Sequence, residues 1–374
     1  MEQVTLTYCD EEFSPEWDAF VDSSNGGICQ TSLWAAYKKT SGWLSFRFYI
    51  KKGNDIIAGC QISIITIRFL GKIGYIQLGA CIKEKTPEII NLVIAEIKKF
   101  AHKNKLLYIC IAPNHTDIDI ISYLESEKFT PQKDGFPPDL KIKATLLLDL
   151  TPSVDDILSQ MKSSKRKHIR KGLKNDILFR EGTREDLSVF FDLSVFTAKK
   201  YSSDPPFKTL EDLYYIWDLL SPNKWIHLHL GIVEGKVICA DISYSIGNTF
   251  QATNWGWNNE YGNYNITEVF HWKLIQWAKE KGYKYFDFVQ VDMKSVKVIL
   301  SNENDDSIKS GKFYGPTLFK MQFGGSVVEY PKVYNYFPGK FKQFLLHRII
   351  GNIMGWIDLN SIIGLIYRVF SKSK

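Results

Sequence analysis

Apolar and polar positions follow their clearest pattern near the middle of the chain, over residues 145–174. The first six residues of this stretch are mostly apolar and predict a buried strand that ends before a Thr-Pro pair. Ser153 is a favourable N-cap. Asp155 and Asp156 would lie in the first helical turn, where carboxylates stabilise the positive end of a helix. We therefore predict a strand followed by one helix that runs to the end of the stretch.

This predicted helix carries two contrasting rows of side chains spaced one turn apart. The first row is apolar and is interrupted only by Lys165: Ile157, Met161, Ile169 and Leu173. The second row is cationic: Lys162, Arg166, Arg170 and Lys174. Cations one turn apart repel one another, so something else must offset that repulsion. The row is either a solvated basic face or a clamp for a polyanion such as phosphates or tRNA, and the pattern alone allows both.

Strands and helices alternate on both sides of this stretch. Predicted strands cover residues 4–8, 46–51, 56–69, 73–78, 106–111, 176–180, 225–233, 237–244, 249–255 and 284–288. Predicted helices cover residues 16–21, 87–103, 184–201, 210–220 and 267–281. Gly53 and Asn54 predict a hairpin turn, and the polar residues 301–312 are expected to form a loop. This order of elements is typical of an α/β chain.

Two pairs of segments indicate an internal repeat. Residues 100–111, FAHKNKLLYICI, align without a gap on residues 277–288, WAKEKGYKYFDF. Residues 55–64 align in the same way on residues 235–244. Each pair keeps its helix or strand character, although few residues are identical. We therefore predict two similar α/β units.

The predicted units occupy residues 1–144 and 145–338, and residues 339–374 form a separate tail. The tail combines apolar runs with basic residues, and Asp358 is its only acid. Such a segment could lie at a membrane interface with its basic residues on anionic lipid, which is the interpretation we favour. The alternative is a pair of helices packed on the second unit.

Composition and charge narrow the class of protein. With 374 residues, 45% of them hydrophobic, the chain is long enough for two globular domains. Its formal net charge of +6 permits an anionic partner without requiring one. The six cysteines form no C-x-x-C pair and indicate free thiols in a reducing compartment. No signal peptide or membrane-spanning stretch is predicted, so we expect a cytoplasmic protein with peripheral contact to the inner face of the plasma membrane.

A set of motifs in fixed order then points to a known family. The motifs are QTSLWAAYKK at 30–39, TLLLDL and RKHIRKGLK in the central stretch, TAKK at 197–200, VFHWKLIQWAKEKGYKYFDF at 269–288 and GPTLFKMQFGG at 315–325. On these residues the chain resembles the Fem-type aminoacyltransferases, which build interpeptide branches on peptidoglycan precursors. The resemblance covers about residues 28–330. It implies two tandem acyltransferase domains of the GNAT type with mixed sheets, an α/β (α+β) fold that agrees with the repeat.

The resemblance also implies a reaction, in which an amine of the precursor attacks the ester carbonyl of an aminoacyl-tRNA. It places Lys320 near the reacting carbonyl, where a cation would stabilise negative charge, and Asp287 where it could orient the amine or act as a base. It implies that Trp34, Lys38 and Lys200 bind the substrate, and that both lysines contact the phosphates of the precursor. The family pattern usually has arginine where Lys200 stands, and a lysine cannot bind a phosphate through two parallel hydrogen bonds as arginine does. The cationic row would bind the tRNA backbone of the donor.

The same residues admit structural interpretations. Lys38 and Lys320 could be ordinary surface charges, and Asp287 could be a strand-end cap. His227 and His229 alternate on a strand without acidic or cysteine partners, so no metal site is predicted there. No resident cofactor is predicted, and no Ser-His-Asp or Cys-His arrangement can be placed.

Two further functions compete with aminoacyl transfer. GNAT domains usually hold the pyrophosphate of acyl-CoA on backbone N–H groups at a glycine-rich helix start. The candidate helix starts at residues 77–88 and 258–269 lack the Q/R-x-x-G-x-G/A pattern, which argues against a CoA pocket in its usual place. The first alternative is nevertheless an acyl-CoA-dependent N-acyltransferase of cell-surface polysaccharide or glycolipid synthesis. The second is a non-catalytic protein of the same fold that binds a polyanion or a membrane.

Overall fold

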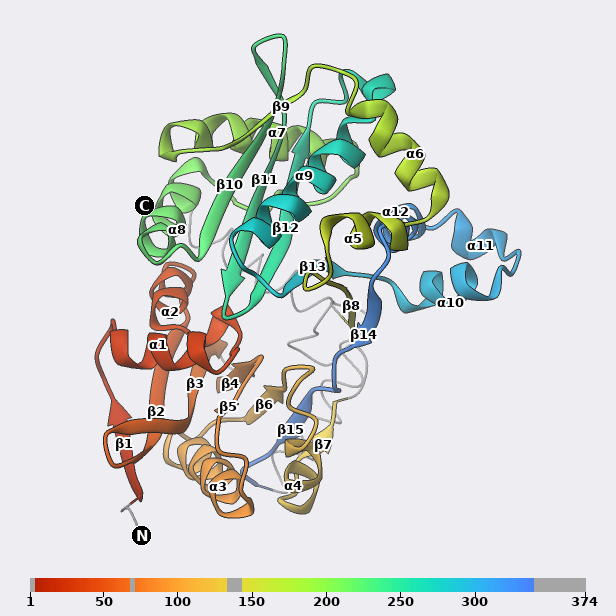
Figure 1. Ribbon diagram of the computed structural model, residues 1–374. Helices are drawn as coiled ribbons and strands as arrows, with labels where there is room; N and C mark the ends of the chain where they lie inside the picture. Colours follow the sequence, from red (N-terminus) through yellow and green to blue (C-terminus); the bar gives the residue numbers. More distant parts are fainter. Residues whose placement is uncertain (1–3, 68–70, 133–142, 340–374) are drawn as a thin grey trace. The chain divides into compact units, whose positions relative to one another are not determined.

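The computed structural model describes residues 4–67, 71–132 and 143–339, and the chain divides into two compact units (Figure 1). The first unit comprises residues 1–141 together with 331–374, and the second comprises Ile142–Tyr330. The tail predicted over residues 339–374 lies outside the described residues from position 340 onward. Among the described residues, every helix is too short or too polar to span a bilayer.

A mixed sheet forms the centre of the first unit. Its strands lie in the order β1-β2-β3-β4-β6-β15-β7, and β5 pairs with β3. The strand bounds are β1 Val4–Cys9, β2 Leu44–Lys52, β3 Asp55–Ile67, β4 Gly71–Gln77, β5 Cys81–Ile82, β6 Tyr108–Ala112, β7 Thr130–Pro131 and β15 Tyr334–Tyr336. The described helices are α1 Pro15–Ser23, α2 Ser32–Lys39, α3 Pro87–Lys103 and α4 Ile120–Ser126, with a 3-10 turn η1 Ile28–Gln30. Strands β1 to β4 are antiparallel neighbours, whereas β4 and β6 run parallel.

Local sequence accounts for the main elements of this unit. Gly53 and Asn54 join β2 to β3, which confirms the predicted hairpin. Helix α3 begins after Thr86, whose hydroxyl accepts a hydrogen bond from the Ile89 backbone N–H at 3.4 Å. The apolar face of α3 enters the core through Ile90, Val93, Ile94, Ile97 and Phe100.

The second unit is also built on a mixed sheet, with strands in the order β14-β8-β13-β12-β11-β10-β9. The strand bounds are β8 Ala144–Asp149, β9 Leu178–Glu181, β10 Ile226–Val233, β11 Lys236–Ile246, β12 Thr249–Trp257, β13 Tyr285–Gln290 and β14 Ser326–Glu329. The described helices are α5 Val154–Gln160, α6 Ser163–Gly172, α7 Leu187–Lys200, α8 Leu210–Leu220, α9 Ile266–Glu280, α10 Met293–Ser301, α11 Asp306–Lys309 and α12 Tyr314–Met321. Short 3-10 turns are η2 Arg184–Asp186, η3 Ser221–Asn223 and η4 Gly262–Tyr264. Among these strands, β12 and β13 pair in parallel.

Helices cover both faces of this second sheet (Figure 1). On one face α7 lies so close to β12 that a Cβ atom on Gly256 would be 2.9 Å from the backbone of Leu193. On the other face α9 packs on β10, where Gly231 faces Phe270. Glycine is required at such points because the helix approaches the strand backbone directly. Strand β11 is consequently buried along most of its length.

The two sheets repeat one order of elements. In each, four antiparallel strands are followed by a helix and by a fifth strand parallel to the fourth. These elements are β1–β4, α3 and β6 in the first unit, and β9–β12, α9 and β13 in the second. The aligned segments 100–111 and 277–288 are the end of the helix and the fifth strand of each unit. The predicted fold class, two tandem α/β units, is confirmed.

The single helix predicted over the central stretch is wrong, because the chain forms α5 and α6 there. Met161 and Lys162 interrupt the helix with extended backbone. Contacts distant in sequence stabilise the break: the Lys162 N–H donates to the Gln322 carbonyl at 3.0 Å, and Met161 is buried. Only two of the four predicted cations, Arg166 and Arg170, therefore lie within α6.

Two smaller predictions are also corrected. Residues 301–312 include α11, because the Asp305 carboxylate accepts hydrogen bonds from the backbone N–H groups of Ser307 and Ile308. Residues 331–338 belong with the first unit, since β15 pairs with β6 and β7. Pairing between strands so distant in sequence leaves no local signal.

Candidate functional site

The carboxyl end of β13 is the point at which the second sheet opens. Strand β12 pairs with β13 only where Thr249–Gln251 face Tyr285–Asp287, and its later residues pair with β11 alone. Strand β13 continues along β8 through an irregularity between Asp287 and Gln290. Carboxyl ends of parallel strands are where α/β proteins commonly place their ligands. This end of the sheet is therefore the candidate site.

The hydrogen bonds of Asp287 fix the conformation of the carboxyl end of β13. Its buried carboxylate accepts hydrogen bonds from the Thr145 hydroxyl of β8, from the Gln251 side chain of β12 at 3.1 Å and from the Val289 backbone N–H at 2.7 Å. Val289 has a φ of +57°, a left-handed conformation that is rare for a β-branched residue. One carboxylate thus connects three neighbouring strands at an irregular turn of the backbone.

Lys320 reaches the same end of β13 from α12. Its ammonium donates to the Gln290 carbonyl at 2.8 Å, and its side chain is only partly exposed. Burial lowers the pKa of Lys320 to about 8, against the opposing effect of the Asp287 carboxylate. The Thr317 hydroxyl fixes α12 by accepting the Asp292 backbone N–H at 3.1 Å. A cation with this pKa can stabilise an oxyanion or exchange a proton near neutral pH.

The start of α9 is covered by α6. A Cβ atom on Gly172 would lie 2.6 Å from the Tyr264 carbonyl oxygen and closer still to the Val269 side chain. Glu268, in the first turn of α9, pairs with Lys165 of α6 at 3.3 Å. Phosphate binding at a helix start requires accessible N–H groups and is opposed by a nearby carboxylate. The start of α9 is therefore a poor site for a nucleotide pyrophosphate.

Lys165 is a buried cation next to the candidate site. Its side chain is 1% exposed, and its Nζ lies 3.9 Å from the ring centroid of Phe319 and 4.8 Å from that of Phe323. Burial lowers the pKa of Lys165, although Glu268 opposes this effect. His271 of α9 lies close by, and burial, reinforced by Lys165 and Lys320, lowers its pKa to about 4. Helices α6, α9 and α12 thus meet around one buried ion pair.

Comparison with known proteins identifies the family of this fold. The model of the FemAB family matches residues 13–215, which is more than half of the chain. The chain belongs to the FemAB family. Its second part, residues 159–294, also matches the acetyltransferase (GNAT) domain. The protein is accordingly an acyltransferase-family enzyme, as the motifs predicted.

Individual relatives of this FemAB-family chain are distant. A lipid II:glycine glycyltransferase of Staphylococcus aureus (strain MRSA252) is 25% identical over 193 residues, which make up 50% of this chain and 46% of that protein. The chain thus matches about half the length of this relative. The crystal structure of FemX superposes with a TM-score of 0.79 at 18% identity, covering 92% of this chain and 99% of FemX. L-PGS from Bacillus licheniformis gives 0.58 at 16% identity, covering 91% and 98%. These superpositions establish a shared fold.

The structure brings together the two residues predicted to be catalytic in this FemAB-family chain. Asp287 and Lys320 both lie at the end of β13, close enough for the carboxylate to raise the pKa of the lysine. The three hydrogen bonds of Asp287 match the geometry of the alternative interpretation, a strand-end cap. The catalytic roles of both residues stay predictions.

The predicted substrate-binding residues lie in two different units. Trp34 and Lys38 are one turn apart on α2 of the first unit, and both are half-buried. Lys200 ends α7 of the second unit, where its Nζ donates to Asn259 Oδ1 at 2.6 Å and lies 5.9 Å from the Trp257 ring centroid. Their predicted contacts with phosphate stay predictions.

The predicted tRNA-binding row contains one residue with a clear structural role. Arg166 donates through Nη1 to the carbonyls of Ser159, at 2.9 Å, and of Met161, so it completes the end of α5. The other three members, Lys162, Arg170 and Lys174, are exposed. The exposed residues Lys167 and Lys171 were not singled out from the sequence, although they lie in the same basic segment.

Lys165 was likewise missed from the sequence. The signal that could have found it is its place in an otherwise apolar row.

The two alternating histidines, His227 and His229, show no sign of a metal-ligand set. The His227 Nε2 lies 2.9 Å from the Ser245 hydroxyl, and burial lowers the pKa of His227 to about 4. His229 is fully buried. Within the described ranges, no cluster of three His, Cys, Asp or Glu side chains could hold a metal ion.

The Lys165–Glu268 pair predicts unequal effects of removing either partner. Glu268→Gln leaves the fully buried Lys165 cation without its counter-charge and should lower the free energy of unfolding by about 3 kcal/mol. Lys165→Met places an unbranched apolar side chain among the same aromatic rings and should change it by about 1 kcal/mol or less. Urea unfolding at pH 7 measures both values. Equal losses in the two variants would contradict this account of the pair.

Proposed function

We propose that the protein transfers an aminoacyl group from aminoacyl-tRNA to an amine of a peptidoglycan precursor. The observation that carries the proposal is Lys320, a partly buried lysine with a pKa near 8 at the open end of the sheet. Membership of the FemAB family and the likeness to a lipid II:glycine glycyltransferase support the same class of reaction.

The proposed reaction exchanges an ester for an amide. The amine nitrogen forms a bond to the carbonyl carbon, the bond from that carbon to the tRNA ribose oxygen breaks, and the leaving hydroxyl takes a proton while the amine loses one. Negative charge develops on the carbonyl oxygen in between, and the Lys320 ammonium stabilises it. Asp287 already accepts three hydrogen bonds, so it orients the strand end and favours the protonated form of Lys320.

The acceptor-binding residues of this proposal are those predicted from the motifs. Lys38, with Trp34 one turn away on α2, and Lys200, at the end of α7, are each proposed as phosphate-binding residues. The tRNA backbone binds the exposed cations of α6 and its flanks, chiefly Arg170 and Lys174. This electrostatic contact requires no particular tRNA sequence.

An acyl-CoA donor is the second candidate. The GNAT-domain match over residues 159–294 favours it, because acyl-CoA is the usual donor of that class. The α6 helix that covers the start of α9, together with Glu268 in its first turn, argues against it. The structure therefore supports aminoacyl-tRNA better.

A donor-competition assay tests the proposal. The purified chain receives UDP-linked or lipid-linked peptidoglycan precursor with either a mixed pool of aminoacyl-tRNA or acetyl-CoA, and the products are identified by mass spectrometry. We expect an added amino-acid mass with the tRNA pool alone. An acetyl increment with acetyl-CoA would replace the proposal with the second candidate. No product from either donor would favour the non-catalytic alternative.

The role of Lys320 predicts a specific pH dependence. Its lowered pKa means that the cation is present below about pH 8 and absent above it, so kcat should fall as the pH rises through that value. Lys320→Gln should lower kcat by about 10²–10³-fold, the range found for loss of one oxyanion donor. Lys320→Arg should keep part of the activity without the alkaline fall, because arginine stays protonated. A kcat that instead rises through pH 8 would make neutral Lys320 a base.

The exposed cations of α6 and of the segment that follows it predict a change in donor affinity alone. The double variant Arg170→Glu/Lys174→Glu should raise the apparent KM for aminoacyl-tRNA. It should also lower the slope of log KM against log salt concentration by about 1 for each tRNA phosphate that the variant no longer binds. The matched control Lys83→Glu/Lys103→Glu makes the same charge change on exposed lysines of the first unit. Equal donor kinetics in both double variants would refute this assignment.

A further inference from the structure

The segment between β12 and α9 carries three aromatic side chains that have no part in the reaction as proposed so far. Trp257 ends β12, and Tyr261 and Tyr264 lie at the start and the end of the 3-10 turn η4. All three side chains are partly exposed. Together they form an aromatic platform beside the start of α9.

The platform presents ring surface that the core of the second unit leaves uncovered. Among the described residues, Tyr261 and Tyr264 make an aromatic contact only with each other, with their ring centroids 5.3 Å apart. Trp255 and Trp277, by contrast, each pack against two or more rings of the core. The two tyrosines can therefore accept a further stacking partner.

An unusual backbone conformation holds the platform. Asn259, Tyr261 and Asn265 have φ angles of +66°, +52° and +56°, in the left-handed region that residues other than glycine seldom adopt. The Tyr261 hydroxyl donates to the Glu234 carboxylate at 2.9 Å, and the Tyr264 N–H donates to the Tyr261 carbonyl at 2.9 Å. Strained residues of this kind cluster at functional sites. A ligand site would account for three of them in one short segment.

Helix α6 packs on α9 and reaches the Tyr264 end of the platform (Figure 1). Gly172 lies against the Tyr264 carbonyl, and the Asn175 side chain donates to the same oxygen at 3.5 Å. The cations next to these two contacts along the chain are exposed: Arg170, Lys171 and Lys174. This end of the platform therefore attracts an anionic ligand.

The other end of the platform has different charges. Glu234 accepts the Tyr261 hydroxyl, and Glu260 directly precedes Tyr261. At Trp257 the Lys200 ammonium lies 5.9 Å from the ring centroid, and Lys200 is already proposed for the acceptor. The phosphates of a donor are therefore expected along α6 and not at this end.

Aromatic side chains beside a row of cations are a common means of holding single-stranded nucleic acid, because bases stack on the rings while the cations follow the phosphates. The platform is also well placed for the reaction. Since β12 and β13 run parallel, the carboxyl end of β12 lies at the same edge of the sheet as Asp287 and Lys320. The length of β12 from Gln251, which contacts Asp287, to Trp257 is about 20 Å. A strand held on the platform can extend over that distance to the candidate site.

We propose that Tyr261 and Tyr264 stack with the unpaired bases at the 3′ end of the donor tRNA, while Arg170 and Lys174 bind the phosphates that precede them. This inference rests on the proposed function, because it concerns the same donor. It goes further by separating two kinds of contact. The cations bind any RNA backbone, whereas the tyrosines bind only the unpaired end.

Equilibrium binding of two uncharged RNAs to the full chain tests the inference. Fluorescence anisotropy compares an intact tRNA with the same tRNA lacking its unpaired 3′ nucleotides. We expect the truncated tRNA to bind about tenfold or more weakly, because its stacked bases are lost. Equal affinity for the two RNAs would overturn the inference but not the proposed function, which the donor-competition assay tests by product mass. Failure of both RNAs to bind would overturn both.

Two variants assign the contact to the tyrosines. Tyr264→Leu keeps an apolar side chain against the core but removes the ring, so intact tRNA should bind about tenfold more weakly and truncated tRNA as tightly as to the wild type. Tyr261→Leu should act in the same direction. Wild-type affinity for intact tRNA in both variants would overturn the assignment.

The matched control is Tyr215→Leu, at an exposed tyrosine of α8 outside the platform, which should change the affinity for neither RNA. Binding of truncated tRNA also shows that each variant is folded, because it depends on the cations of α6 and its flank alone. A loss of affinity for intact tRNA in Tyr215→Leu as large as in Tyr264→Leu would contradict a specific role of the platform.

Discussion

The hydrogen bonds of one buried carboxylate determine the shape of the second unit at its candidate site. Asp287 connects β8, β12 and the irregular end of β13, and it does so where the parallel strands cease to pair. A buried carboxylate is strongly unfavourable unless such partners surround it. Because the carboxylate is satisfied, the strand end is fixed, and Lys320 and its contact with Gln290 are held in place.

Two lysines of the second unit are largely removed from water. Lys165 and Lys320 both have lowered pKa values, since removal from water disfavours the charged form. Their surroundings differ in kind. Lys165 lies between aromatic rings and a carboxylate that hold three helices together, whereas Lys320 touches a strand end through one carbonyl. The first arrangement suits a structural role, and the second leaves capacity to interact with a substrate.

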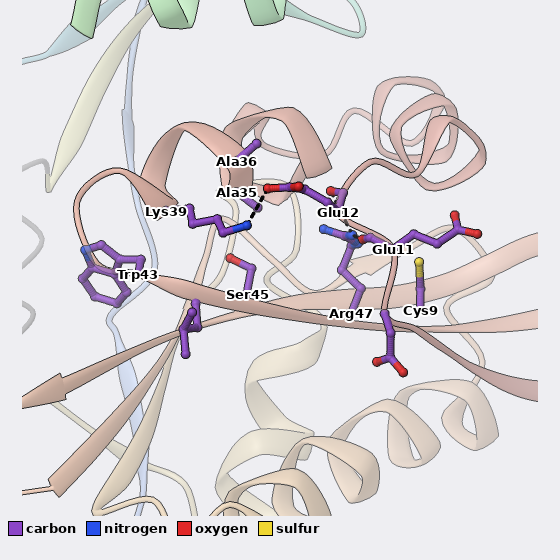
Figure 2. A pocket seen from close by; sticks show the side chains of 11 residues that line it. Cys9, Glu11, Glu12, Ala35, Ala36, Lys39, Trp43, Ser45 and Arg47 are labelled. Atoms are coloured by element: carbon purple, nitrogen blue, oxygen red, sulfur yellow. Dashed lines mark hydrogen bonds and ion pairs between the residues drawn. The ribbon is translucent and has the colours of Figure 1, made fainter.

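The two units share one order of strands and helices, but the functional side chains that they carry differ. In the first unit, a pocket beside α2 is lined by acidic, basic and apolar residues (Figure 2). In the second unit, the candidate site lies at the carboxyl end of β13, where Asp287 and Lys320 are close together. One fold can carry such different sites because function depends on the side chains placed on it.

The sequence alone determined the features that depend on local order. Alternating apolar patterns, the Gly53-Asn54 turn and the repeat yielded the strands, the hairpin and the two-unit fold, because such signals act over a few residues. The family motifs singled out Asp287 and Lys320 before their proximity was known. Tertiary structure alone decided the break at Met161, since the Gln322 carbonyl that stabilises it is distant in sequence. It also decided that Lys165 is buried rather than solvated: one lysine in an apolar row does not reveal that distant aromatic rings and a carboxylate will surround it.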